Sequence, residues 1–399
     1  MVVGLMHRAV DISSLETILG LLSETDSDRD WSGIDLGRLV DRQAFTKSLF
    51  IIKASGSYLE GPQNSGEISK REQLLLVLAL LEQLGAPIIF VHGAGQVIRR
   101  KLEDVERIAR DYHLSVKEVD RLNYMNEEIR YVTPKATQFI LDIARMLTIS
   151  IGEELKSYLD EPNRVLKVPS SPFIGSLVDH FALQKDESGV MAYDNCHSKL
   201  PVQNKLPEDR VIRSAIEKIY SFHRRLGGGI SVNTFLSNVH MPQGYLQFMQ
   251  GESREGMPDL REVNGDADEV TASFAIDARD HFRFADGSRP TRIYTGFFTE
   301  SGGVLDEDGR VMTLITPQYK LGNVVSGGMA NKARTCKTIA QWLTTREILG
   351  LVAMATPLDF LNFMLKVNYD AHQYGGLGTT FSDPKKSRMY VVSTAGKWS

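Results

Sequence analysis

PIIFVHGAGQ, residues 87–96, decides the fold of this chain. A proline opens the stretch, and Ile88–Val91 form an apolar run without polar alternation. Such a run is typical of a strand buried on both faces of a sheet. It ends in the glycine-containing loop His92–Gly95, and residues of helical composition follow. Glycines between a strand and a helix allow a tight turn whose backbone N–H groups face an anion. The stretch therefore predicts a strand, a glycine loop and a helix start.

A second strand and glycine loop lie upstream. Ser48–Lys53 is another apolar run that ends in a lysine, and Ala54–Gly56 follow it. Lys70–Leu84 is leucine-rich and of helical composition, so the whole unit reads as strand, helix, strand. Both glycine loops are then expected at one edge of a parallel sheet, beyond the carboxyl ends of the strands, where ligands bind. Two such loops and a lysine indicate a polyphosphate. Each loop alone also fits an ordinary turn, and neither matches a P-loop or a dinucleotide-binding signature.

Composition limits the classes of function. A chain of 399 residues with 42% hydrophobic and 24% charged residues suits one large α/β domain with additions, or two domains. A net charge of −4 gives no electrostatic footprint for nucleic acid. No apolar run approaches the roughly 20 residues that span a bilayer, and the first residues make a poor signal peptide. Cys196 and Cys336 are expected to be reduced thiols of a cytoplasmic protein, and Cys196-His197 lacks a second ligand pair for a metal.

Three charged residues stand at expected helix starts. Arg130 precedes a helix that opens at Thr133 or Pro134, where it could grip a carboxylate or simply be solvated. Asp268 belongs to NGDAD at another helix start, which suits either a cap or a group that orients a lysine. Lys332 follows a glycine pair in the first turn of a helix expected from about Met329 to Leu349. Since a lysine there opposes the helix dipole, a phosphate would explain its presence.

Further elements follow from local patterns. An amphipathic pattern predicts a helix over 208–225 with a glycine C-cap at 227–229. Apolar runs predict strands at 165–168, 230–232, 291–298 and 388–392, and a helix over 357–367.

Several segments occur in one order: IIKASG, VHGAGQ, EEIRYVTPKAT, NGDAD with EVTASFA, FFTESGGVLDEDGRVMTLITP running into VVSGGMANK, and GLGTTF. Together they resemble the amino-acid kinase family, most closely N-acetylglutamate kinase and the kinase part of acetylglutamate synthase–kinases. The resemblance covers about 47–135 and 262–382. It implies an open, mainly parallel α/β sheet with helices on both faces, a three-layer sandwich. We expect a helical extension over 1–46 and a kinase-like domain over 47–399, with a divergent middle region at about 160–250.

The resemblance also implies an activity and roles for residues. The activity is ATP-dependent phosphorylation of the side-chain carboxylate of an N-acylated amino acid such as N-acetylglutamate, as in arginine biosynthesis. Lys53 and Lys332 would neutralise the transferring phosphoryl group, and Asp268 would hold both lysines. The implied substrate-binding residues, with the phosphate-facing loops, are Gly56, Gly93, Ala94, Gly95, Arg130 and Asn264. The implied nucleotide-binding residues are Ser55, Gly302, Gly303, Val304, Leu305, Gly327, Gly328 and Met329.

The same resemblance sets expectations about cofactors and partners. ATP would bring Mg²⁺, held mainly by the nucleotide phosphates and water rather than by protein ligands. The expected partners are a small-molecule substrate and further copies of the chain in a dimer or higher homo-oligomer, with no nucleic acid and no membrane. Two alternatives remain open. One is a kinase for another small carboxylate or phosphate in specialised metabolism, and the other is a catalytically weak regulatory member of the fold.

Overall fold

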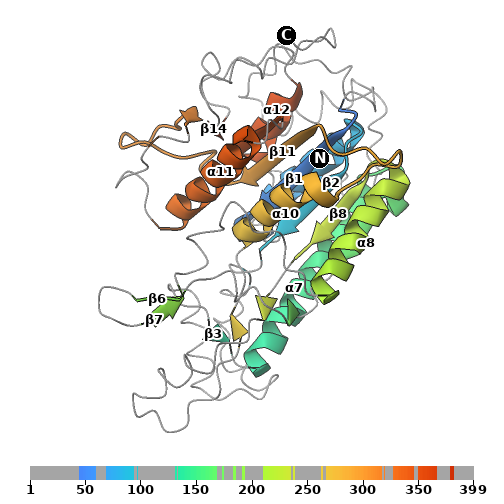
Figure 1. Ribbon diagram of the computed structural model, residues 1–399, viewed down its shortest axis with the longest axis horizontal. Helices are drawn as coiled ribbons and strands as arrows, with labels where there is room; N and C mark the ends of the chain where they lie inside the picture. The colour runs from blue at the N-terminus through green and yellow to red at the C-terminus, as the bar shows by residue number, and fades with distance from the viewer. Residues whose placement is uncertain are drawn as a thin grey trace, which may run out of the picture.

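The structure, a computed structural model, describes a central sheet, the helices that cover it and three short strand pairs (Figure 1). The described residues are 45–59, 69–93, 97, 131–132, 134–168, 173–174, 183–185, 191–193, 210–234, 237–238, 262–263, 267–316, 319, 327–345, 349–365 and 378–381. The expected extension over 1–46 lies outside them except for residues 45 and 46. Most of the helix expected after Gly95, and the strand expected at 388–392, also lie outside.

An eight-stranded sheet forms the centre of the protein, in the order β12–β14–β13–β11–β1–β2–β8–β4. The six strands from β13 to β4 run parallel, while β14 runs antiparallel to β13, and β12 pairs in parallel with β14. The strands are β1 (Ser48–Ala54), β2 (Ile88–His92), β4 (Val165–Val168), β8 (Ile230–Asn233), β11 (Arg292–Phe298), β12 (Leu314–Ile315), β13 (Leu349–Ala355) and β14 (Thr379–Phe381). This open, mainly parallel sheet confirms the fold class expected from the sequence.

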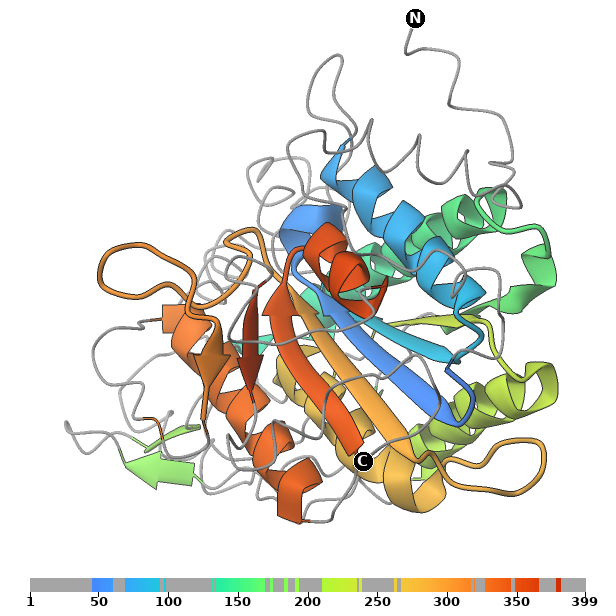
Figure 2. The ribbon, with the colours of Figure 1, turned by 90° about the horizontal axis from the view of Figure 1, so that it is seen from above.

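Helices cover both faces of the sheet, which explains why the central strands show no polar alternation. On β1, Phe50 and Ile52 pack into one core and Leu49 and Ile51 into the other. The first core is covered by α3 (Lys70–Gln83), α7 (Pro134–Ser157) and α12 (Pro357–Leu365). The second is covered by α8 (Arg210–Leu226), α10 (Ala267–His281) and α11 (Gly327–Thr345). Figure 2 shows the two helix groups on opposite sides of the strands, so the protein is a three-layer sandwich.

The helix ends follow local chemistry. α3 begins with a capping box in which the Ser69 hydroxyl accepts from the N–H of Glu72 and the Glu72 carboxylate accepts from the N–H of Ser69. α8 ends at Leu226, and Gly227 follows with a φ of 66°, which favours glycine; the N–H of Gly227 donates to the carbonyl of His223. The C-cap expected from the glycines after this helix is therefore confirmed.

The start of α11 differs from the sequence prediction. The helix begins at Gly327 rather than near Met329, and Lys332 consequently lies in its second turn instead of its first. Glycine can adopt helical dihedral angles, so Gly327 and Gly328 form the first turn rather than a break before it. α11 ends at Thr345, not at Leu349, because Leu349 opens the buried strand β13.

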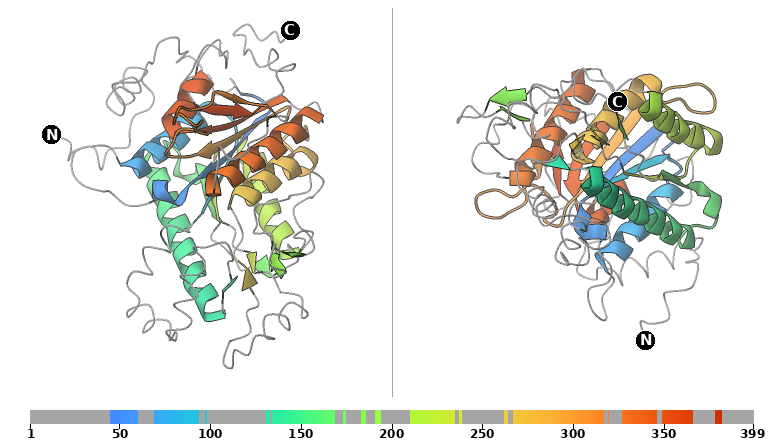
Figure 3. Two further views of the ribbon diagram at one scale, coloured as in Figure 1. Left: turned by 90° about the vertical axis from the view of Figure 1, so that its left-hand side faces the viewer. Right: turned by 90° about the horizontal axis from the view of Figure 1, so that it is seen from below.

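Three short strand pairs lie off one end of the main sheet (Figure 3). They are β3 (Tyr131–Val132) with β10 (Glu262–Val263), β5 (Phe173–Ile174) with β9 (Ser237–Asn238), and β6 (Leu183–Lys185) with β7 (Met191–Tyr193). β9 also packs beside β10. Residues 160–250 therefore contribute β4 and β8 to the main sheet, and β5, β6, β7 and β9 to the small strand pairs.

Candidate active site at the carboxyl edge of the sheet

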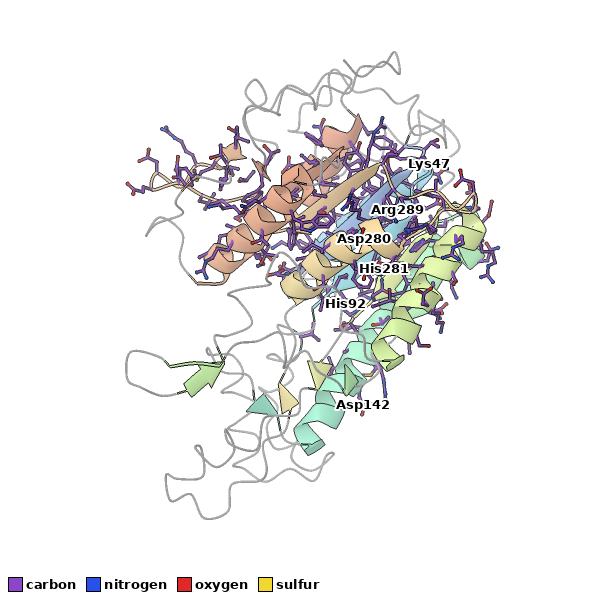
Figure 4. All side chains as sticks on the ribbon, in the orientation of Figure 1. Lys47, His92, Asp142, Asp280, His281 and Arg289 are labelled. Atoms are coloured by element: carbon purple, nitrogen blue, oxygen red, sulfur yellow. The ribbon has the colours of Figure 1, made fainter. Side chains whose placement is uncertain are left out.

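The two glycine loops follow neighbouring parallel strands. Ala54 at the end of β1 is in register with His92 at the end of β2, so Gly56 and Gly93 come directly after paired strand ends. Figure 4 shows Lys47, which precedes β1, and His92 at opposite ends of the sheet. This placement confirms that Gly56 and Gly93 lie at one edge, the carboxyl edge. Ala94 and Gly95 of the second loop lie outside the described residues.

A buried ion pair marks this edge. The Nζ of Lys53, near the end of β1, lies 2.6 Å from Oδ1 of Asp268 in the first turn of α10. The two side chains are only 7% and 9% exposed. Removing two charges from water costs several kcal/mol per ion, and the attraction of the pair offsets this only in part. Such an arrangement is poor as a device for stability and is typical of a site that needs charge in a fixed place.

The charge of Lys332 acts on the same buried thiol as the charges of the ion pair. Cys336, one helical turn further along α11, is a free and fully buried thiol. Burial raises the pKa of this thiol well above its usual range, and the negative charge of Asp268 raises it further. The positive charges of Lys332 and Lys53 act on the same thiol in the opposite direction. The charges of Lys53, Asp268 and Lys332 therefore all act on this one buried thiol. The other cysteine, Cys196, lies outside the described residues.

The amino termini of two helices also lie at the carboxyl edge of the sheet. α10 and α11 each run back along the sheet to a parallel strand, so both begin at the carboxyl edge. A Cβ added to Gly93 would lie 3.6 Å from Cβ of Ala267, the first residue of α10. The partial positive charge of a helix amino terminus thus lies beside the second glycine loop and attracts an anion.

Replacing Gly93 by alanine should separate binding from stability. The contact of 3.6 Å is ordinary van der Waals distance, so the fold should accept the methyl group, with a stability change within about 0.5 kcal/mol. The same methyl group would hold a phosphate away from the backbone N–H groups, and we expect turnover to fall at least about tenfold. Thermal unfolding and steady-state kinetics on this variant measure both effects. Unchanged turnover would show that no ligand approaches the backbone at Gly93.

The first glycine loop is a short turn held from three sides. Gly56–Leu59 form a 3-10 turn, η2, whose first N–H groups have no carbonyl partner within the turn. The N–H of Ser55 donates to the carbonyl of Phe298 on β11 (3.3 Å). The guanidinium of Arg71 donates to the carbonyl of Leu59 (3.0 Å) and holds Glu154 on α7 with two further hydrogen bonds. The loop that carries Ser55 and Gly56 is therefore fixed relative to both α3 and α7.

The proposed nucleotide loop, Gly302–Leu305, follows β11 and opens a hairpin. The N–H of Val304 donates to Oγ1 of Thr379 (2.8 Å), and its side chain is fully buried. Leu305 pairs with Val311 across the hairpin and is 37% exposed. A Cβ on Gly303 would come within 2.6 Å of Thr379 Oγ1, so only glycine fits there. Within this loop, the apolar side chain of Leu305 is exposed and could contact a nucleotide, whereas the side chain of Val304 packs in the core.

The start of α11 supplies the other expected nucleotide residues. Gly327 and Gly328 form its first turn, and Met329 is half-buried and packs against the second core. The backbone of this first turn, rather than the Met329 side chain, is therefore what the helix presents to an anion.

The two expected substrate-binding side chains of the middle region, Arg130 and Asn264, lie outside the described residues. Their neighbours in the sequence are nevertheless paired. Tyr131, which follows Arg130, is in register with Val263, which precedes Asn264, in the antiparallel pair β3–β10. No local sequence pattern signals this pairing, because the two strands are short and far apart in the chain.

His92 is a feature of the edge to which the sequence analysis gave no role. It is 1% exposed, and its Nε2 lies 2.9 Å from Oγ1 of Thr148 on α7. Burial lowers the pKa of its imidazole to about 4, an effect that the Gly93 backbone opposes and the charge of Arg71 reinforces. The ring is therefore neutral near pH 7 and links the end of β2 to α7.

Solved structures of similar chain arrangement include three that bind small molecules. One is N-acetylglutamate synthase from Neisseria gonorrhoeae, complexed with coenzyme A and L-arginine, which is 12% identical with a TM-score of 0.42. The match covers 86% of this chain and 63% of the synthase. Carbamate kinase from Giardia lamblia bound to AMP-PNP is 12% identical with a TM-score of 0.40, over 85% of this chain and 100% of that one. Isopentenyl phosphate kinase from T. acidophilum, in a product complex, is 12% identical with a TM-score of 0.40, over 84% and 99%.

These likenesses concern the path of the chain alone, and this chain spans less than two thirds of the synthase. The α/β class rests on the sheet and layers themselves. No protein-family model and no curated protein matches the sequence. Among the described residues, no helix is both long enough and apolar enough to cross a membrane.

Proposed function

We propose that this protein is an ATP-dependent small-molecule kinase that phosphorylates a carboxylate. The observation that carries the proposal is the buried pair Lys53–Asp268, at the sheet edge where two glycine loops and two helix amino termini meet. The charge of Lys332 on the second of these helices acts on the same buried thiol as the pair. A polyphosphate needs positive charge and free N–H groups from several directions. This edge supplies both, and its open glycine at Gly93 leaves room for close approach.

The residues favour phosphoryl transfer over other uses of a bound phosphate. Such transfer depends mainly on positioning and charge neutralisation. A carboxylate oxygen of the acceptor would form a bond to the γ-phosphorus while the bond from that phosphorus to the β–γ bridging oxygen breaks and ADP leaves. Lys53 and Lys332 would neutralise the oxygens of the moving group from two sides, and Asp268 would keep Lys53 in place. No general base is required, because the attacking carboxylate is already ionised at neutral pH.

The acceptor class follows from the resemblance in the sequence. We propose an N-acylated amino acid such as N-acetylglutamate, with Arg130 holding its α-carboxylate and Asn264 contacting it nearby. The paired residues Tyr131 and Val263 support this, since they flank the two side chains in sequence. ATP would lie along Gly302–Leu305 and the start of α11, with Mg²⁺ carried by its phosphates.

Nucleotide binding and acceptor turnover test the proposal in one series. Calorimetry with a non-hydrolysable ATP analogue and Mg²⁺ should show binding in the micromolar to millimolar range, and a panel of acylated and free amino acids should reveal ADP release with at least one acylated member. Absence of binding at millimolar nucleotide would refute the kinase proposal. Binding without turnover of any acceptor would instead favour a regulatory protein that keeps the fold.

A further inference from the structure

Asn233 is the last residue of β8 and is fully buried. Its Nδ2 contacts three acceptors: the carbonyl of Phe90 on β2 (3.1 Å), the carbonyl of Ser231 (2.8 Å) and the hydroxyl oxygen of Ser231 (3.0 Å). A carbonyl oxygen accepts but never donates, so these contacts fix which arm of the amide carries nitrogen. The other arm, Oδ1, therefore points away from both carbonyls.

The hydroxyl of Ser231 reinforces this orientation. Nδ1 of His223 on α8 lies 3.0 Å from the carbonyl of Gly228 and must donate to it, so Nε2 of the neutral ring accepts from Ser231, 3.0 Å away. The single hydroxyl proton of Ser231 is thereby used, and its oxygen is left to accept from Asn233. His223, Ser231 and Asn233 form one buried chain of hydrogen bonds with a fixed direction.

Oδ1 of Asn233 is buried and has no hydrogen-bond partner within the part of the chain that the structure describes. Buried amide oxygens are nearly always bonded, since an unsatisfied one forfeits the hydrogen bonds that it made to water. A ligand N–H group would supply a donor to an acceptor that is oriented in this way.

Asn233 lies on the same face of the sheet as Lys53, two strands away. Lys53 is in register with Val91 on β2, and Val91 is in register with Asn233. These three residues form a row across the sheet, on the face that carries α8 and α10, because Lys53 reaches Asp268 and Asn233 reaches Ser231 beside α8. Two strand spacings separate Lys53 from Asn233, roughly 10 Å.

The chain that follows Asn233 leads to the proposed acceptor side. Four residues later it enters β9, which packs beside β10, and the residue after β10 is Asn264. The chain therefore runs from Asn233 to the small strands whose neighbours in the sequence are the proposed acceptor residues.

We infer that Asn233 determines acceptor specificity: its Oδ1 accepts a hydrogen bond from an N–H group of the acceptor, the amide N–H in an acyl-amino acid. The inference rests on the proposed function and narrows its substrate class. It excludes acceptors that carry no hydrogen-bond donor in place of this N–H group.

The test compares an amide with the ester that lacks the N–H group. N-acetylglutamate and 2-acetoxyglutarate differ at one atom, and both are measured by calorimetry with the ATP analogue present and by turnover with ATP. The wild-type protein should prefer the amide by about 10–100-fold, because the ester oxygen faces Oδ1 with no proton. In Asn233→Leu, which keeps the volume but removes the acceptor, affinity for the amide should fall by that factor while affinity for the ester stays.

A matched control separates specificity from folding. Ser231→Ala removes a buried partner on the same strand and face but leaves Oδ1, so it should lower the melting temperature and retain the preference for the amide. Equal binding of both ligands by the wild-type protein, binding of neither, or an undiminished preference in Asn233→Leu would overturn the inference. Preferential binding of the amide without phosphoryl transfer would refute the proposed kinase activity instead and would support the role of Asn233.

Discussion

Replacing either lysine of the site by methionine should reduce turnover by about 10²–10³-fold. The charges of Lys53 and Lys332 act on the same buried thiol. In the proposed reaction, each lysine would neutralise charge that grows on the phosphoryl oxygens during transfer. Loss of one preorganised positive charge removes stabilisation that exists mainly in the transition state, so kcat should fall much more than nucleotide affinity.

The two variants should differ in stability, which distinguishes their environments. Lys53 is 7% exposed and paired with Asp268, so Lys53→Met leaves a carboxylate buried without that partner and should cost on the order of 3 kcal/mol. Lys332 is only half-buried, and its loss should cost less. The double variant Lys53→Met/Asp268→Leu replaces the pair by apolar groups and should regain stability while remaining inactive.

Steady-state kinetics and chemical denaturation on these variants measure both effects. Near-normal turnover in either single variant, with the fold intact, would show that this lysine has no part in the chemistry. Recovery of activity in the double variant would show that the pair is only structural.

The free energy of unfolding should fall by about 2 kcal/mol for each of two buried histidines between pH 7 and pH 5. Burial lowers the pKa of His92 and of His223 from 6.5 to about 4. Near pH 5 both rings are therefore neutral in the folded protein and protonated in the unfolded chain. Since the unfolded state binds the extra protons, lowering the pH through this window favours unfolding, and the loss is complete only below about pH 4.

Urea denaturation at several pH values tests this, with His92→Gln and His223→Gln as separate comparisons. In each variant, the slope of the free energy of unfolding against pH should decrease by the contribution of about one bound proton. Carboxyl groups whose pKa values the fold lowers, such as Glu300 beside Lys70, change the free energy of unfolding mainly at lower pH. The change between pH 7 and pH 5 therefore reports mainly on the histidines. An unchanged slope in His223→Gln would mean that its ring is protonated or solvated in the folded protein.

The sequence by itself determined the fold class and the position of two glycine loops at one edge of the sheet. Ile88–Val91 and Leu49–Ile52 are apolar at every position. This pattern is typical of a strand that is covered on both faces, because successive side chains point to opposite faces and both faces are buried. Glycines directly after such strands place backbone N–H groups at the carboxyl edge, since parallel strands end together. The structure confirms both features through the register of β1 with β2.

Only the tertiary structure decided which side chains meet at that edge. Local patterns report burial and backbone freedom, whereas a contact between distant residues depends on strand order and register. The pair Lys53–Asp268, the shared surroundings of Cys336 and the pairing of Tyr131 with Val263 all arise in this way. Asn233 shows the same limit most sharply. In the sequence it is a polar residue at the end of a short apolar run, and its function becomes visible only when Phe90 and Ser231 fix its nitrogen and leave its oxygen without a donor in the described chain.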